Sequence, residues 1–229
     1  MRTCIDSPAK TLHLTYSHAP IAMHTSLQQE IAQAAAALIV DEGLEIGPAK
    51  QRALKQLGLR PNTALPDNRS VEDAVREHIA LFHADTQPQV LQALRDIAAH
   101  WMQQLAEFEP LLGGAVWNGT ATHWSPIHLQ LFCDDSKALP IWLLNHGLDF
   151  DTQEAKGLGG QPTEVLGVHV TTQHPALQPQ VLLCLWNNPS QALRGALQAD
   201  ADGQAPRGTL QGLQARMTET GAMPQSPKP

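Results

Sequence analysis

The residues best suited to chemistry lie in a stretch from residue 113 to 135, which contains two glycines, a small-residue turn and an apolar segment that ends in Asp134 and Asp135. Glu164 begins the next long apolar segment, so these carboxylates can form a site for a divalent cation such as Mg²⁺ or Mn²⁺. Adjacent carboxylates at a strand end also commonly form turns or cap a following helix. We favour the capping role for Asp134 and Asp135 and keep the metal site as the alternative.

The same stretch resembles the signature of the polymerase-beta type of nucleotidyltransferase, in which a Gly-rich turn precedes a strand with alternate metal-binding carboxylates. The resemblance covers roughly residues 110–187. It implies that backbone amides at the turn hold a nucleoside triphosphate, because glycine lets the main chain approach phosphate oxygens. The nucleotide-binding residues that it implies here are Gly113, Gly114, Gly119, Thr120, Trp124 and Ser125.

The sequence departs from this family at two positions. Where the family has aspartates two residues apart, this chain has Pro126 and His128. Proline has no side-chain donor or acceptor, and a neutral imidazole is a poor ligand for Mg²⁺. The resemblance therefore implies a scaffold without the usual two-metal chemistry. The alternative is an altered active site in which His128 and Glu164 are catalytic and Asp134 and Asp135 bind the metal.

Other nucleotide-linked activities find less support. Short proteins similar to this one are sometimes labelled UDP-N-acetylmuramate-alanine ligases. Such ligases need an ATP-binding G-K-[ST] loop, and the sequence has none. The dinucleotide-binding G-x-G-x-x-G turn, the G-x-S-x-G nucleophile elbow and the zinc-binding H-E-x-x-H motif are missing as well.

Histidines occur in three pairs separated by five residues: His78/His83, His123/His128 and His169/His174. This spacing differs from the i, i+4 arrangement that places two imidazoles on one helix face, and on a strand it points them to opposite sides. The sequence therefore does not predict a zinc site. His123 and His128 can still converge over the Gly-rich turn as phosphate-facing groups or a general base, although we favour structural roles.

Two aromatic residues and two arginines complete the candidates. Trp124 lies in a turn among polar residues and is predicted to be exposed, whereas Trp117 is predicted to lie in the core. Arg194 and Arg207 occur beside glycines in a late loop, where guanidinium groups can close over an anion. A solvated loop charge is the interpretation that we favour for both.

The composition sets the broad class. With 229 residues, 42% of them apolar and 16% charged, the chain can bury the core of one domain with or without a helical extension. A net charge of -7 without a cluster of Lys or Arg makes nucleic-acid binding an unfavoured function. Three widely spaced cysteines and no apolar stretch of membrane-spanning length favour a cytoplasmic protein with free thiols that does not bind membranes.

Apolar periodicity predicts helices first and strands later. Capping and turn residues place four helices at residues 26–42, 47–57, 70–82 and 86–108. Strands are expected at 115–117, 127–133, 163–171 and 181–186, with a helix at 138–146 and a short terminal helix near residue 215. The predicted fold class is α+β, with N-terminal helices followed by a small mixed sheet. Its nucleotidyltransferase-like character is what the resemblance implies.

These observations divide the chain into four segments. We expect a disordered or wrongly assigned start at residues 1–25, a helical region at 26–112, a nucleotidyltransferase-like half at 113–217 and a disordered tail at 218–229. If the start is wrongly assigned, Met23 is the alternative to Met1 as the first residue. The expected function is binding of a nucleotide or a protein partner by a catalytically degenerate protein. An active nucleotidyltransferase, which would need Mg²⁺ or Mn²⁺, and a non-enzymatic interaction module are the alternatives.

Overall fold

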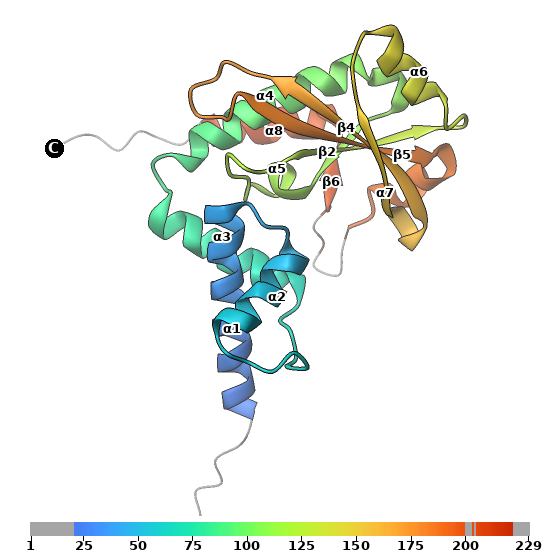
Figure 1. Cartoon of the computed structure of the whole chain (residues 1–229). Helices are drawn as coiled ribbons and strands as arrows, with labels where there is room; N and C mark the ends of the chain where they lie inside the picture. The colour runs from blue at the N-terminus through green and yellow to red at the C-terminus, as the bar shows by residue number, and fades with distance from the viewer. Residues whose placement is uncertain (1–20, 200–202, 204, 222–229) are drawn as a thin grey trace, which may run out of the picture.

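Helices precede a mixed sheet along the chain (Figure 1). The computed structural model describes residues 21–199, 203 and 205–221. Three helices form a separate N-terminal group, and the later elements build a sheet covered by further helices (Figure 1). The broad prediction of N-terminal helices followed by a mixed sheet is confirmed.

The N-terminal group consists of α1 (Ile21–Glu42), α2 (Ile46–Gln56) and α3 (Asn68–Phe82). Small and branched apolar side chains from all three form one core, including Ile31, Ala35, Ala53, Leu54, Val71 and Val75. Alanine at these positions lets the helices approach closely, while the branched residues fill the space between them. The group therefore has a core of its own, apart from the core on the sheet.

The sheet contains six strands among the described residues, in the order β3-β4-β5-β2-β1-β6. Their bounds are β1 Leu111–Gly113, β2 Ile127–Cys133, β3 Asp151–Lys156, β4 Pro162–Thr171, β5 Gln180–Pro189 and β6 Arg207–Gly208. Strands β2 and β5 are parallel, and the other neighbours are antiparallel. The central position of β5 agrees with its long apolar run.

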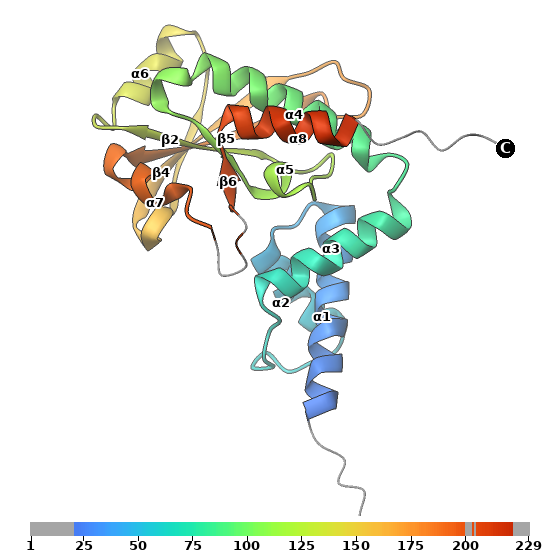
Figure 2. The ribbon, with the colours of Figure 1, turned by 180° about the vertical axis from the view of Figure 1, so that it is seen from behind.

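One face of the sheet is covered by α4 (Gln87–Gln104), α6 (Ala138–Asn145) and α8 (Leu210–Gly221), and α4 and α8 cross it together in Figure 2. Ile127, Leu129 and Leu131 of β2 are fully buried in this core. His128 and Gln130 point to the opposite face, as the period of two in a strand requires. The alternation predicted for residues 127–133 is therefore confirmed.

On that opposite face, η3 (Ser190–Ala192) and α7 (Leu193–Ala196) cover only the end of β2. Phe132 packs there with Leu111 and Ala196 in a small apolar cluster. The negative charge of Glu45, in the loop between α1 and α2, acts on both His128 and Cys184 of this face. The loop between α1 and α2 therefore lies within electrostatic range of His128.

Two predicted helix starts are wrong. Helix α1 begins at Ile21, five residues before the predicted cap at Ser26, because Ala22 and Met23 favour the helix and extend it backwards. Helix α3 is capped by Asp67, whose carboxylate accepts a hydrogen bond of 2.7 Å from the Ser70 backbone N–H. A capping carboxylate three residues earlier therefore replaces the predicted capping role of Ser70.

The strand predicted at 115–117 is instead the short helix α5 (Gly114–Asn118). Two arginines stabilise the helical backbone: Arg95 donates to the carbonyl of Val116 at 3.3 Å, and Arg216 donates to the carbonyl of Trp117 at 3.2 Å. Strand β3 and the short strands β1 and β6 were not predicted. The β3 segment is largely polar and exposed, because it forms an edge of the sheet.

The chain ends partly agree with the predictions. Residues 1–20 and 222–229 lie outside the described part of the chain, so most of the two segments predicted to be disordered is not covered. Residues 21–25 and 218–221 are helical, which corrects both predicted boundaries. Within the described residues, no helix combines the length and the apolar character needed to cross a membrane.

Candidate functional site

The candidate site is built around the turn from β1 into α5. Gly113 is extended, and Gly114 has φ = +68°, a conformation that side-chain-bearing residues rarely adopt. A Cβ atom at Gly114 would stand 3.2 Å from Cδ2 of His128. The two glycines therefore bring the backbone close to the imidazole on the neighbouring strand.

His128 is held in one tautomer by Trp186 on β5. The indole Nε1–H of Trp186 donates to His128 Nδ1 at 3.1 Å, so Nδ1 carries no proton and the neutral ring bears its proton on Nε2. Burial lowers the pKa of His128 below its usual value, an effect that the negative charge of Glu45 only partly opposes. His128 is therefore a neutral hydrogen-bond donor near pH 7.

Amide side chains continue the same face beyond His128. Asn188 Nδ2 donates to Gln130 Oε1 at 2.9 Å and to the carbonyl of Trp186 at 3.0 Å. Burial, with a contribution from Glu45, raises the pKa of Cys184 to about 11, so the thiol stays protonated. Since β2 and β5 contain no Asp or Glu, these strands carry neutral groups where two-metal chemistry would need carboxylates.

Arg207 adds a positive charge beside the turn. It pairs with Gly113 in the register of β1 and β6, and a Cβ atom at Gly113 would lie 3.6 Å from the Arg207 Cβ. Its Nη1 donates to the Ala196 carbonyl at 2.6 Å, and burial lowers the pKa of this guanidinium. An arginine remains charged at neutral pH even so. Arg194 is an exposed residue of α7.

The other residues expected to bind a nucleotide have structural contacts. Gly119 ends α5 with φ = +83°, and the buried Thr120 donates its backbone N–H to the Ala115 carbonyl at 3.0 Å. Ser125 Oγ accepts a hydrogen bond of 2.9 Å from the Thr122 backbone N–H. These residues shape the far end of α5, whereas Gly113 and Gly114 form its beginning.

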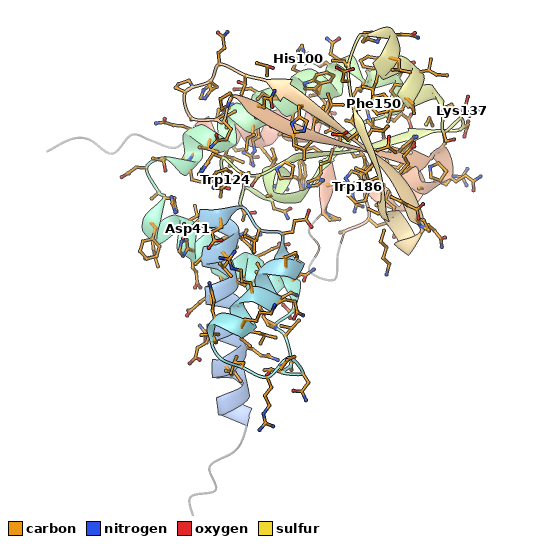
Figure 3. All side chains as sticks on the ribbon, in the orientation of Figure 1. Asp41, His100, Trp124, Lys137, Phe150 and Trp186 are labelled. Carbon is orange, nitrogen blue, oxygen red and sulfur yellow. The ribbon has the colours of Figure 1, made fainter. Side chains whose placement is uncertain are left out.

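Trp124 connects the two parts of the molecule. It is 47% exposed, as predicted, and its side chain lies against Gly43 in the loop between α1 and α2. Figure 3 shows Trp124 near Asp41, and Trp186 on the side of the sheet that faces the N-terminal helices. Trp117 is buried, which confirms that prediction.

Asp134 and Asp135 follow β2 and are exposed. Asp135 Oδ1 accepts a hydrogen bond of 2.9 Å from the Lys137 backbone N–H, immediately before α6 begins. This contact forms a turn, whereas the favoured capping role is wrong, because the N-cap residue of α6 is Lys137 and no side chain caps this helix. Within the described residues, Asp134, Asp135 and Glu164 do not form a group whose ligand oxygens all lie within 4.8 Å of one another.

Glu164 and His128 lie on opposite faces of the sheet. Glu164 pairs with Asn187, which pairs with Leu131, and Leu131 points away from the face that carries His128. Glu164 Oε2 accepts a hydrogen bond of 3.1 Å from Asn187 Nδ2. These two residues, which the altered-site hypothesis assigns to catalysis, therefore cannot act on the same substrate atom.

His123 and His128, for which we favour structural roles over convergence at the turn, make separate contacts. His123 lies against Trp124, with ring centroids 4.6 Å apart, whereas His128 contacts Gly114 and Trp186. A cluster that the sequence did not predict lies nearby on the helices: Asp41, His78 and His83. The His78/His83 pair is the feature of the sequence that points to this cluster, but a separation of five residues does not by itself place two imidazoles on one helix face.

The larger hollows among the described residues include two that lie away from the turn at Gly114. One of about 410 Å³ is bounded by the 147–151 segment and β4. An apolar hollow of about 390 Å³ lies between η1 (Ala106–Phe108), α7 and α8. Neither contains a residue of the Gly113–His128–Trp186 group.

No model of a known protein family matches the chain, and no curated protein matches it either.

Proposed function

We propose that the protein is a nucleotidyltransferase-like module that binds a nucleoside triphosphate without catalysing metal-dependent transfer. The observation that supports this proposal is the set of donors around one glycine turn. Gly114 lies against the ring of His128, whose neutral form carries its proton on Nε2, and the cationic Arg207 pairs with Gly113 on the neighbouring strand. Phosphate oxygens are the ligands that such donors favour.

The lack of nearby carboxylates on the sheet supports the non-catalytic part of the proposal. Strands β2 and β5 supply His128, Gln130, Cys184, Trp186 and Asn188 to the face beside the turn, all of them neutral. Phosphoryl or nucleotidyl transfer with Mg²⁺ needs oxygen ligands that hold the metal against the phosphates. The binding of nucleotide should therefore not depend on a divalent cation.

A thermal-shift panel of ATP, GTP, CTP and UTP, each with Mg²⁺ or with EDTA, tests the proposal on the full chain. At a hundredfold excess over its Kd, a ligand stabilises the folded state by about 2.7 kcal/mol. For a domain of this size that is roughly a 5–10 °C rise in Tm. We expect at least one nucleotide to give this rise equally with EDTA and with Mg²⁺.

Two arginine variants provide the matched comparison. Arg207→Gln removes the charge beside Gly113, whereas Arg194→Gln removes the same charge from an exposed position on α7. A charge-assisted hydrogen bond contributes about 1.5–3 kcal/mol, so Arg207→Gln should weaken nucleotide binding by about tenfold or more. Arg194→Gln should leave it within about twofold. A rise in Tm that requires Mg²⁺ would favour the enzyme alternative, and no rise with any nucleotide would favour an interaction module.

A further inference from the structure

Three side chains with metal-binding groups meet where α1 and α3 end. Asp41 lies one residue before the end of α1, His78 lies in the last turns of α3, and His83 follows α3 directly. His83 Nε2 is 3.3 Å from Asp41 Oδ1, and His78 Nε2 is 3.6 Å from Asp41 Oδ2. Each carboxylate oxygen therefore faces a different imidazole.

The end of α3 explains how the two histidines converge. On a continuous helix, residues five apart point about 140° away from each other. His83 is the C-cap residue, with φ = -131° and ψ = 15°, so its backbone has already left the helix. The two imidazole centroids consequently lie only 5.9 Å apart.

We propose that Asp41, His78 and His83 form a binding site for Zn²⁺ or a similar first-row transition-metal ion. Bonds of 2.0–2.2 Å to nitrogen and oxygen at tetrahedral angles place ligand atoms roughly 3.3–3.5 Å apart. The distance of 3.3 Å from His83 Nε2 to Asp41 Oδ1 matches this value, and His78 Nε2 lies 3.6 Å from the other carboxylate oxygen. One ligand atom from each of the three residues lies within 4.8 Å of the other two. Imidazole nitrogen with one carboxylate is a ligand set that suits these ions.

The surroundings leave the carboxylate available to a cation. The basic side chains on neighbouring turns pair with other acids: Arg52 lies 2.6 Å from Glu42, and Arg76 lies 2.6 Å from Asp73. The side chain of His78 is 18% exposed and that of Asp41 is 51% exposed, so an ion can enter from solvent. The fourth coordination position is open to water, as in zinc sites with three protein ligands.

The site is independent of the proposed nucleotide site. It lies where α1 and α3 end and contains none of the residues around Gly114. A bound ion would link the end of α1 to the end of α3. Because the ion would bind the folded chain only, it would raise the Tm of the protein.

The test measures binding of Zn²⁺ to the full chain after removal of metals with a chelator. Isothermal titration gives the stoichiometry and the affinity, and Co²⁺ gives visible absorption bands that report tetrahedral coordination. We expect one Zn²⁺ per chain and a Co²⁺ spectrum of the tetrahedral type. His78→Gln and His83→Gln should each weaken the binding of Zn²⁺ by at least about tenfold.

Matched controls separate this site from other histidines. His169→Gln and His174→Gln alter the pair with the same spacing on and after β4, and should leave the affinity unchanged. Asp41→Asn keeps an oxygen that can accept a hydrogen bond from His83 but removes the charge, so it should lose metal affinity while the Tm without metal stays the same. The proposal would be overturned if the chain failed to bind one equivalent of Zn²⁺. It would also be overturned if His78→Gln and His83→Gln left the affinity for Zn²⁺ unchanged.

Discussion

At the scale of single residues, His128 determines what the candidate site can do. Its Nδ1 accepts the Trp186 indole N–H, and its ring lies against Gly114. This arrangement presents one neutral donor, Nε2–H, beside a glycine turn. This donor fits the anion recognition that we propose, because a neutral imidazole with one free proton offers neither charge nor oxygen to Mg²⁺.

The buried state of His128 predicts a dependence of stability on pH. Burial lowers its pKa in the folded chain, whereas the unfolded chain keeps a value of about 6.5. As pH falls below about 6.5 the unfolded state takes up the proton first, so stability decreases until pH reaches the folded-state pKa. Above about pH 6.5 this contribution to the pH dependence disappears.

We therefore expect the Tm of the wild type to fall more steeply between about pH 7 and pH 5 than that of His128→Asn. The amide oxygen of Asn can accept the hydrogen bond from Trp186 but does not titrate. Thermal melts of both proteins across this range make the comparison. Parallel curves for the two proteins would show that His128 titrates as it does in the unfolded chain.

Some features of the candidate sites can be predicted from single residues in the sequence, and others cannot. The departure from carboxylates at Pro126 and His128 is visible directly. The partner of His128 is not, because Trp186 lies 58 residues later and meets it only through the pairing of β2 with β5. The convergence of His78 and His83 depends on where α3 ends, which a spacing rule alone does not give.

At the scale of elements, long periodic segments were predictable and short ones were not. The central strand β2 and helix α6 follow from alternation and from apolar clustering. Helix α5 could not be predicted, because Arg95 of α4 and Arg216 of α8 stabilise its backbone from distant parts of the chain. Strand β3 is mostly polar, so its assignment requires its neighbour β4.

The loop between α1 and α2 supplies a prediction at this scale. Gly43 and Gly58 both have φ near +70°, but only Gly43 would carry a Cβ atom into Trp124, at 2.6 Å from the Trp124 Cβ. Both alanine variants suffer the backbone strain of about 1 kcal/mol, and Gly43→Ala adds an overpacking penalty of about 1–3 kcal/mol. Urea denaturation should show Gly43→Ala to be the less stable of the two by that added amount.

Equal stabilities of the two variants would mean that the contact between Trp124 and the loop contributes nothing. The comparison is informative because Gly58, at the end of α2, has nothing within 4 Å of the position of its Cβ atom. Gly58→Ala therefore reports the loss of stability that the left-handed backbone conformation alone causes.

At the scale of the whole molecule, the loop between the N-terminal helices α1 and α2 contacts the segment that precedes β2. Trp124 from the segment before β2 packs on Gly43, and the charge of Glu45 acts on His128 and Cys184 of the sheet. A nucleotide at the Gly113–Gly114 turn would lie next to this junction. The order of helices before a mixed sheet was predictable from periodicity, whereas this junction was not, because its contacts join residues about 80 or more positions apart.

The central claim is that the turn at Gly114 binds a nucleotide without metal, and the most direct test is nuclear magnetic resonance of the ¹⁵N-labelled full chain. The five tryptophans give separate indole signals, so Trp186 beside the turn and Trp142 on α6 can be followed together. With ATP and EDTA, we predict shifts of the Trp186 indole and the Gly114 amide, and a constant Trp142 signal. Unchanged Trp186 and Gly114 signals at saturating nucleotide, or shifts that require Mg²⁺, would contradict the account.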